Sequence, residues 1–373
     1  LIKDLEYLKN YDLVDIPGIN EFNPDAKSSY KLDDPKYIKY IHFHNLIEDE
    51  MENYVPSSEK SYLTEIFKII KNKMNNGIIV FSVDNYIGLA EFFDDKLFGL
   101  AEVIFWDRET GKKIAYHTFM GPSRRFVPID TQESVCTSYA PRYIKISWSR
   151  RRNKISLSFV VRGDKFRPAA KAHYIARLSE DGKAEMLSVT PSPTTQRCSA
   201  TWIVPMNLEG GLNLGKHRHY IKEIPQGKGL GLMLLNRTYL KPRSSSEVMF
   251  GMTVADGKNI VFAYSNTTQD ALDEDTYNDN MLSVNNELTA MPPVVITHPF
   301  GLSGKWIAQD TEGMVDLTFN PVSLNDRILN IVLMRNAYTT IYGTFEGVLV
   351  SKDGEKIVLK NCPGIVKKSH IRL

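Results

Sequence analysis

The stretch Lys154-Ile-Ser-Leu-Ser-Phe-Val-Val161 alternates polar and apolar side chains along its length. A period of two residues is typical of an antiparallel β-strand with one buried face. Similar short runs recur from Gly77 to the end of the chain, and several joints between them end in a glycine that can adopt the positive φ of a tight turn. These joints are Glu109-Thr-Gly111, Glu180-Asp-Gly182, Ala255-Asp-Gly257, Thr311-Glu-Gly313 and Lys352-Asp-Gly354. The pattern predicts a mainly β protein and excludes alternating βαβ units.

Residues 1–75 differ from the rest of the chain. They hold fourteen Asp or Glu, ten Lys and no Arg, a net charge of −4. Within them, Tyr62–Met74 places apolar side chains at helical spacing. We therefore expect an α-helical N-terminal segment over residues 1–76.

A stiff polar link, Thr190-Pro-Ser-Pro-Thr194, interrupts the strand-rich part of the chain. Each proline fixes φ and removes a backbone donor, so neither favours a central strand. The expected division is a first β-barrel over residues 77–192 and a second over 193–373.

Composition sets outer limits on the kind of protein. The chain has 373 residues, a formal net charge of +2 and 42% hydrophobic residues, which excludes disordered and collagen-like proteins. Only three cysteines occur, Cys136, Cys198 and Cys362, which argues against a disulfide framework. With no visible signal peptide, this favours an intracellular, cytoplasmic protein. No apolar run reaches the roughly 18 residues of a membrane span.

A series of residues in the last third of the chain carries a family resemblance: Met314-Val-Asp-Leu-Thr-Phe-Asn-Pro321, Arg327, Asn330, Tyr342-Gly-Thr-Phe-Glu-Gly347, Lys352-Asp-Gly-Glu355, Cys362-Pro-Gly364, His370 and Arg372. It resembles the C-terminal part of the domain of unknown function 2804 family, over about residues 77–373. The resemblance implies two lipocalin-like antiparallel β-barrels side by side. The hydroxyneurosporene synthase-like branch of the tandem lipocalin-like (calycin) group shares that arrangement. Members of that group bind or convert apolar, terpenoid-like or polyketide-like molecules between the barrels.

The chain also departs from the family pattern. The family's tryptophan-rich central stretch corresponds here to Gly229 through Arg237, which holds neither tryptophan nor aspartate. Its closing tryptophan is replaced by Leu373. These departures favour a divergent member without the chemistry of its relatives.

Short catalytic motifs are missing: there is no G-x-S-x-G, H-E-x-x-H, Walker or C-x-x-C sequence. Gly227, Gly229 and Gly231 lack the spacing of a dinucleotide loop and are interpreted as a flexible loop entering a strand. The densest histidine pair is His217-Arg218-His219, whose imidazoles would share one face of a strand. It is a candidate for contact with a ligand or an anion, with a solvated basic loop as the alternative. We predict no metal and no cofactor.

The segment 121–174 is strongly basic, with twelve Lys or Arg and three acidic residues. Trp148 and the run Arg150, Arg151, Arg152 through Lys154 are candidates for binding nucleic acid or an acidic protein surface, or form only a charged hairpin tip. Trp306, in a lipocalin-like Gly304-Lys-Trp306, completes the candidate ligand- or partner-binding residues together with Arg237 and Arg327.

Three functions remain open. The first expectation is a non-catalytic binding or interaction protein whose partner is another protein or an apolar ligand. The alternative is a hydratase, isomerase or cyclase acting on a hydrophobic, terpenoid- or lipid-like substrate between the barrels. The second alternative is a nucleic-acid or ribonucleoprotein-associated factor using segment 121–174. An apolar cavity with a few convergent polar side chains would favour ligand binding or catalysis.

Overall fold

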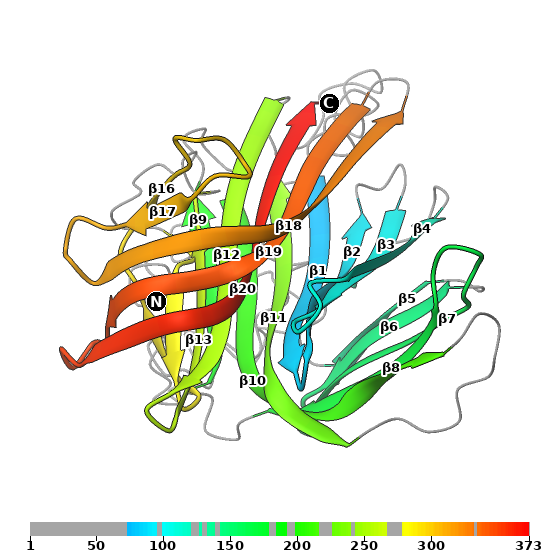
Figure 1. Cartoon of the computed structure of the whole chain (residues 1–373), viewed down its shortest axis with the longest axis horizontal. Helices are drawn as coiled ribbons and strands as arrows, with labels where there is room; N and C mark the ends of the chain where they lie inside the picture. The colour runs from blue at the N-terminus through cyan, green and yellow to red at the C-terminus, as the bar shows by residue number, and fades with distance from the viewer. Residues whose placement is uncertain are drawn as a thin grey trace, which may run out of the picture.

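A computed structural model describes residues 73–94, 99–120, 127–128, 133–138, 142–178, 184–191, 198–215, 226–239, 243–266, 278–331 and 334–372. In these residues all regular structure is β-strand, and the strands form two curled antiparallel sheets (Figure 1). The prediction of a mainly β protein is confirmed. The expected helical segment lies outside the described residues except for Lys73–Asn76, which are strand and not helix.

The first sheet has the strand order β4-β3-β2-β1-β11-β10-β8-β7-β6-β5, with β9 paired to the first part of β10. Its strands are β1 (Lys73–Val83), β2 (Tyr86–Asp94), β3 (Gly99–Asp107), β4 (Lys113–Met120), β5 (Glu133–Thr137), β6 (Arg142–Ser149), β7 (Lys154–Val161), β8 (Ala169–Arg177), β9 (Met186–Pro191), β10 (Cys198–Gly215) and β11 (Gly227–Tyr239).

The second sheet has the strand order β15-β14-β13-β12-β20-β19-β18-β17-β16. Its strands are β12 (Arg243–Ala255), β13 (Lys258–Ser265), β14 (Met281–Val284), β15 (Glu287–Ala290), β16 (Val295–Thr297), β17 (Trp306–Gln309), β18 (Val315–Ile331), β19 (Met334–Val350) and β20 (Lys356–Arg372). The chain thus passes from one sheet to the other between β11 and β12. The boundary expected at 192/193 falls between β9 and β10, which pair within the first sheet.

The turn between β12 and β13 has the backbone that its sequence predicts. Asp256 and Gly257 have φ of 49° and 76°, as a two-residue hairpin of type I′ requires. Positive φ at Gly111, Gly313 and Gly354 confirms three more of the expected turns.

One strand is irregular, and one sequence interpretation is corrected. β18 is a single long strand from Val315 to Ile331, with a bulge between Pro321 and Ser323. Pro321 cannot donate to the ladder, so an irregularity there is accommodated without ending the strand. The loop expected at Gly227–Gly231 is the start of β11, where a Cβ on Gly229 would stand 2.1 Å from the carbonyl oxygen of Ser82. Glycine is needed there because β1 and β11 approach closely.

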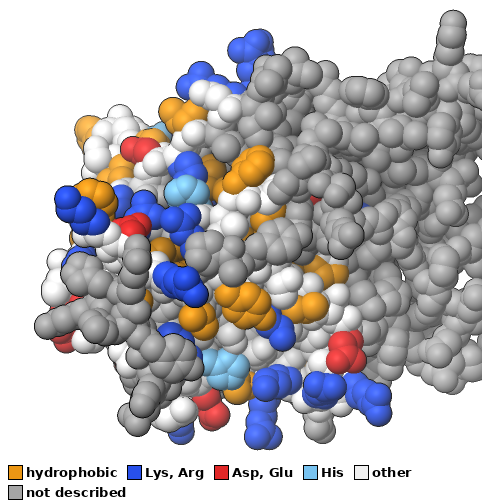
Figure 2. Space-filling model, turned by 90° about the vertical axis from the view of Figure 1, so that its right-hand side faces the viewer, with side chains coloured by type: hydrophobic (Ala, Val, Ile, Leu, Met, Phe, Trp, Pro, Cys, Tyr) orange, Lys and Arg blue, Asp and Glu red, His pale blue; other side chains and the backbone are white. Residues whose placement is uncertain are grey.

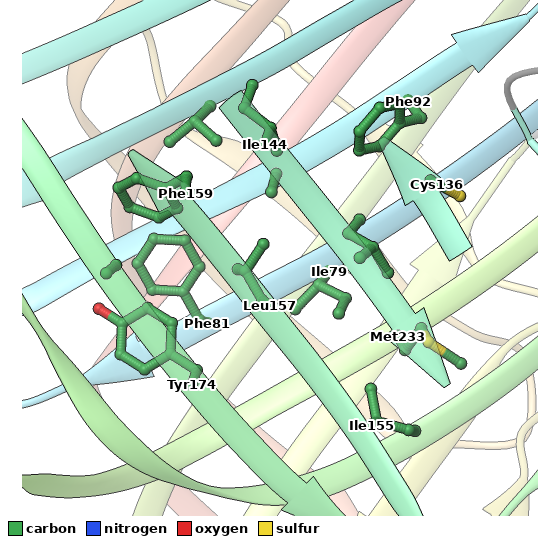
Figure 3. Close-up of a cluster of buried hydrophobic side chains, with 14 of the residues drawn as sticks. Ile79, Phe81, Phe92, Cys136, Ile144, Ile155, Leu157, Phe159, Tyr174 and Met233 are labelled. Atoms are coloured by element: carbon green, nitrogen blue, oxygen red, sulfur yellow. The ribbon is translucent and has the colours of Figure 1, made fainter. Parts of the chain in front are cut away.

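Three apolar clusters follow from the alternation of side chains along these strands. One fills the inside of the first curled sheet, where side chains of β6, β7 and β8 meet those of β1 and β2 (Figure 3). A second fills the inside of the second sheet. The third, called here the inter-sheet layer, joins the outer faces of both sheets. It includes Val80, Ile104 and Leu232 from the first sheet and Phe250 and Ile365 from the second.

The inter-sheet layer predicts a sharp difference between two isoleucines. Ile104 on β3 is fully buried in the layer, whereas Ile328 on β18 is 57% exposed. We expect Ile104→Ala to lower the free energy of unfolding by about 2–5 kcal/mol and Ile328→Ala by less than about 0.5 kcal/mol. Urea denaturation of both variants measures this, and equal effects would contradict burial between the sheets.

Candidate active site between the sheets

A cavity of about 90 Å³ opens at one end of the inter-sheet layer. Strands of both sheets supply its walls: β1, β2 and β3 on one side, β12, β19 and β20 on the other. Its apolar lining consists of Ile78, Phe93, Leu100, Val248, Phe250 and Ile371. Its polar lining consists of Asn76, Glu91, Glu102, Ser246, Asn336, Tyr338, Lys367 and Ser369. The cavity is therefore an apolar space with polar groups gathered on part of its wall, as in sites for small molecules.

Strand register brings the two acids of this cavity together. Glu91 on β2 pairs directly with Glu102 on β3, and both side chains point toward the second sheet. Glu102 is two residues from Ile104 on β3, so both side chains lie on the same face of the sheet, and Ile104 belongs to the inter-sheet layer. A buried acid here needs partners, because an unpaired charge in an apolar layer is strongly unfavourable.

Glu102 finds its partners on the second sheet. The Tyr338 hydroxyl donates to Glu102 Oε2 at 2.7 Å, and Arg327 Nη2 lies 3.1 Å from Glu102 Oε1. Arg327 Nη1 also donates to Tyr338 Oη at 3.2 Å. The three side chains form a closed triangle of polar contacts that spans the two sheets.

Glu91 is held in a similar way. Asn76 Nδ2 donates to Glu91 Oε1 at 2.8 Å, and Lys367 Nζ donates to the same oxygen. Lys367 Nζ also lies 5.3 Å from the centre of the Tyr338 ring. Two carboxylates of one sheet thus face two cations of the other, a set that we call the buried quartet: Glu91, Glu102, Arg327 and Lys367.

The surroundings of Glu102 raise the pKa of its carboxyl. Burial raises the pKa of its carboxyl above the ordinary value, and the negative charge of Glu91 adds to the rise, against the opposing effects of Arg327 and the Tyr338 hydrogen bond. Burial and the charge of Glu102 raise the pKa of Tyr338 well above its usual value. Tyr338 therefore stays a hydroxyl donor, while Glu102 takes up a proton more readily than an exposed carboxyl. This is a pair suited to acid–base chemistry.

His117 extends the site along β4. Its Nδ1 lies 3.0 Å from Arg327 Nη2, and because arginine only donates, Nδ1 must be the acceptor and the ring proton sits on Nε2. Burial and the charges of Arg327, Arg142 and Arg167 lower the pKa of His117 to about 4. The imidazole is thus neutral at physiological pH and helps to orient Arg327.

Of the residues proposed from sequence, Arg327 lies in this site. Trp148 is buried inside the first sheet, where its ring meets Trp202. Arg150 forms a two-point contact with the Glu185 carboxylate and stands 4.9 Å over the Trp202 ring. Arg151 and Arg152 are exposed on the turn between β6 and β7.

The other proposed residues lie elsewhere. Arg237 is buried on β11, and its Nε donates to Asn75 Oδ1 at 2.8 Å. Trp306 is buried in the second sheet, where its indole nitrogen donates to the Leu302 carbonyl oxygen at 3.1 Å. His217, Arg218 and His219 lie outside the described residues.

Sequence reasoning missed Glu91, Glu102, Tyr338 and Lys367. A signal for the two acids existed, since Gly-Leu-Ala-Glu occurs at 88–91 and again at 99–102, each time inside an apolar run. A glutamate within a strand whose neighbours are all apolar indicates a buried, paired acid. No comparable local signal marks Tyr338 or Lys367.

The basic segment contributes a charged surface on the side opposite the second sheet. β6, β7 and β8 contain no Asp or Glu, and Lys145, Lys154 and Lys171 belong to their outer face together with the exposed Tyr143 and Val160. Figure 2 views this side of the molecule, where Lys and Arg side chains are more frequent than Asp and Glu among the coloured residues.

Comparison with known families identifies the chain. The model of the family described as Domain of unknown function (DUF2804) matches residues 66–373. The chain belongs to this family. No curated protein sequence matches this DUF2804 protein.

Several solved structures resemble this DUF2804 protein at low identity. One, from Nitrosomonas europaea and provisionally named AttH, is 11% identical with a TM-score of 0.49 and covers 80% of this chain and 92% of its own. Kievitone hydratase from Nectria haematococca is 11% identical with a TM-score of 0.40, covering 81% of this chain and 89% of its own. CghA is 9% identical, with the same TM-score and coverage.

The expectation of a non-catalytic binding protein is corrected here. The structures similar to this DUF2804 protein include one named as a hydratase, and the missing short motifs on which the expectation rested do not bear on a site assembled from many strands of both sheets. Likeness at this level assigns no activity. Two further findings concern the described residues alone: no helix there could cross a membrane, and no three His, Cys, Asp or Glu side chains are grouped to hold a metal.

The lowered pKa of His117 predicts a pH dependence of stability. At pH values between about 4 and 6.5, His117 binds a proton in the unfolded chain but not in the folded one. The contribution of His117 to the free energy of unfolding is therefore complete above pH 6.5 and is lost as the pH falls toward 4. We expect His117→Asn, which keeps an acceptor for Arg327, to make the change in unfolding free energy between high and low pH smaller by about 1–2 kcal/mol. This is less than the full pKa shift would give, because the ring is partly exposed to solvent.

Urea denaturation at pH 4.5 and 7.0 measures this difference. The exposed His370 provides the control, since His370→Asn should leave the pH dependence as it is in the wild type. If the unfolding free energy of His117→Asn changed between the two pH values as much as that of the wild type, the fold would not be what keeps the imidazole neutral.

Proposed function

We propose that this DUF2804 protein is an enzyme of the hydratase, isomerase or cyclase type, acting by proton transfer on an apolar, terpenoid- or lipid-like substrate held between the two sheets. One observation carries the proposal: a buried glutamate with a raised pKa, hydrogen-bonded to a buried tyrosine, faces a cavity whose remaining wall is largely apolar. Such a pairing of a perturbed acid with an apolar space is the usual physical basis of acid–base catalysis.

The residues divide the work as follows. Glu102 gives its proton to one carbon of a substrate double bond, water adds to the other carbon, and the added water returns a proton to the carboxylate. In an isomerisation the same carboxyl would give and take protons on different carbons without water. Tyr338 and Arg327 orient Glu102 and balance its charge when the proton has left. The apolar lining would exclude bulk water from the reacting carbon atoms.

The finer description of the fold belongs to the same proposal. We infer that the two curled sheets are a pair of lipocalin-like barrels, with the cavity in the position where the tandem arrangement would place a ligand. The helical N-terminal segment and the division into domains remain predictions.

Replacement of Glu102 tests the catalytic assignment. We would incubate the protein in D₂O with a panel of apolar terpenoid alkenes and enones and measure deuterium incorporation by mass spectrometry. Glu102→Gln should lower the rate by about 10²–10⁴-fold, the usual contribution of a general acid or base. Glu355→Gln is the matched control, because Glu355 lies in an exposed ion pair with Lys258. Equal incorporation by Glu102→Gln and wild type would remove Glu102 from the mechanism.

A second candidate function, association with single-stranded nucleic acid, draws support from the acid-free outer face of β6–β8. Exposed Arg151 and Arg152 continue this face at the β6–β7 turn, and Tyr143 offers a ring for stacking. This function is compatible with an active site elsewhere, since the cavity lies on the opposite side of β1–β3.

Salt dependence tests this second function. Affinity for single-stranded RNA should fall linearly on a log–log plot against salt, and Arg151→Ala with Arg152→Ala should reduce the slope by about 1.4. Lys258→Ala, on β13 of the second sheet, should leave the slope unchanged. Absence of measurable binding at low salt would exclude the function.

A further inference from the structure

Two serines in the wall of the cavity have hydrogen-bonding capacity left over. Ser246 on β12 and Ser369 on β20 are direct partners in the strand pair, and their Oγ atoms lie 2.6 Å apart. This bond uses one hydroxyl hydrogen, so the pair keeps a second hydrogen to donate and lone pairs to accept. Neither hydroxyl has a further hydrogen-bond partner among the described residues. Both residues line the cavity and are partly exposed, so a small polar molecule there can use this capacity.

Strand register places the serine pair beside the acid–base pair. Arg327, Tyr338, Ser369 and Ser246 form one continuous row across β18, β19, β20 and β12. Residues paired directly on neighbouring strands have their side chains on the same face, so the row faces the first sheet, where Glu102 lies. One half of the row serves the acid, because Arg327 and Tyr338 both contact Glu102. The serine half is uncharged and bonds only within itself among the described residues.

The position of this pair, and not the bond itself, makes it a candidate site. Ser147 and Ser156 form the same kind of bond, at 2.7 Å, on the outer face of the first sheet. Cross-strand bonds between hydroxyl side chains are a common means of stabilising a sheet. Only the pair at 246 and 369 combines this bond with a place in the cavity wall and a neighbouring acid–base pair.

We propose that Ser246 and Ser369 hold a water molecule as the second reactant, so that the site carries out hydration in preference to isomerisation. This inference rests on the proposed function, in which Glu102 protonates one carbon of a double bond. A water that accepts the spare serine hydrogen and donates to a serine oxygen keeps a lone pair for the other carbon. The uncharged pair holds this water without adding a charge to the apolar cavity.

The step balances with water as the only co-reactant. The π electrons of the double bond form the new bond to the proton from Glu102, and a lone pair of the water oxygen forms the bond to the second carbon. The added water then loses a proton, which restores the Glu102 carboxyl. The net change is the addition of one water molecule to the substrate, with nothing oxidised or reduced by an outside reagent.

Double isotope labelling tests the proposal. The terpenoid alkenes are incubated in water labelled with both deuterium and ¹⁸O, and mass spectrometry measures both labels in the products. Hydration adds deuterium and ¹⁸O, whereas isomerisation adds deuterium alone. We expect both labels in the wild-type products. Ser246→Ala combined with Ser369→Ala should lower the ratio of ¹⁸O to deuterium by about tenfold, as expected for the loss of hydrogen bonding to the reacting water.

Two further variants separate the role of the hydroxyls from a general effect on the sheet. Ser147→Ala combined with Ser156→Ala removes the equivalent bond outside the cavity and should leave the label ratio at its wild-type value. Ser369→Thr keeps a hydroxyl at the site and should retain ¹⁸O in the products. Because the paired alanines leave no hydroxyl unpaired, the double variant in the cavity is expected to fold. If it does not, Ser369→Ala alone gives the same comparison.

The two labels distinguish failure of this inference from failure of the proposed function. Deuterium without ¹⁸O in the wild-type products would overturn the inference and leave proton transfer by Glu102 standing. A wild-type label ratio in the double alanine variant would also overturn the inference, since the water would then be held elsewhere. Absence of both labels would overturn both. Glu102→Gln should lower both labels together, because water addition requires the prior protonation of the substrate.

Discussion

The packing of the outer faces of two sheets on one another is the constraint on which the rest of the molecule depends. Strands β1, β2, β3 and β11 already bury their inner faces within the first sheet, so contact with the second sheet buries them on both sides. Such strands must be apolar almost throughout, as β2 and β3 are. Any ionisable group placed in this layer has to find its counter-charge across the interface.

The buried quartet satisfies that requirement in a way that ties the site to the assembly of the two sheets. Each ion pair joins a glutamate of the first sheet to a cation of the second. Loss of one partner from a buried pair usually costs about 3–5 kcal/mol, because the other charge is left without compensation. The sheets therefore cannot shift against each other without disturbing the site, and the geometry of Glu102 and Tyr338 is fixed by the same packing that stabilises the fold.

Local features were predictable from the sequence, and long-range ones were not. The β7 strand and the Asp256-Gly257 turn depend on neighbouring residues, and both match expectation. The continuity of β18 depends on its pairing with β19, which no local pattern displays. The site shows the same limit: 236 residues separate Tyr338 from Glu102, so their contact exists only once both sheets have formed. Arg327 was found through the family resemblance, without any indication of what it touches.

The two glutamates are paired to different cations, and burial is the main cause of the raised pKa of Glu102. Lys367 is a compact charge directed at Glu91, which also accepts from Asn76. Arg327 forms an ion pair with Glu102, donates to Tyr338 Oη and lies beside His117 Nδ1, and its charge opposes the rise in the pKa of Glu102 only in part. The ionised Glu91 next to it further opposes a second negative charge. The carboxyl beside the tyrosine therefore takes up a proton more readily than an exposed glutamate does.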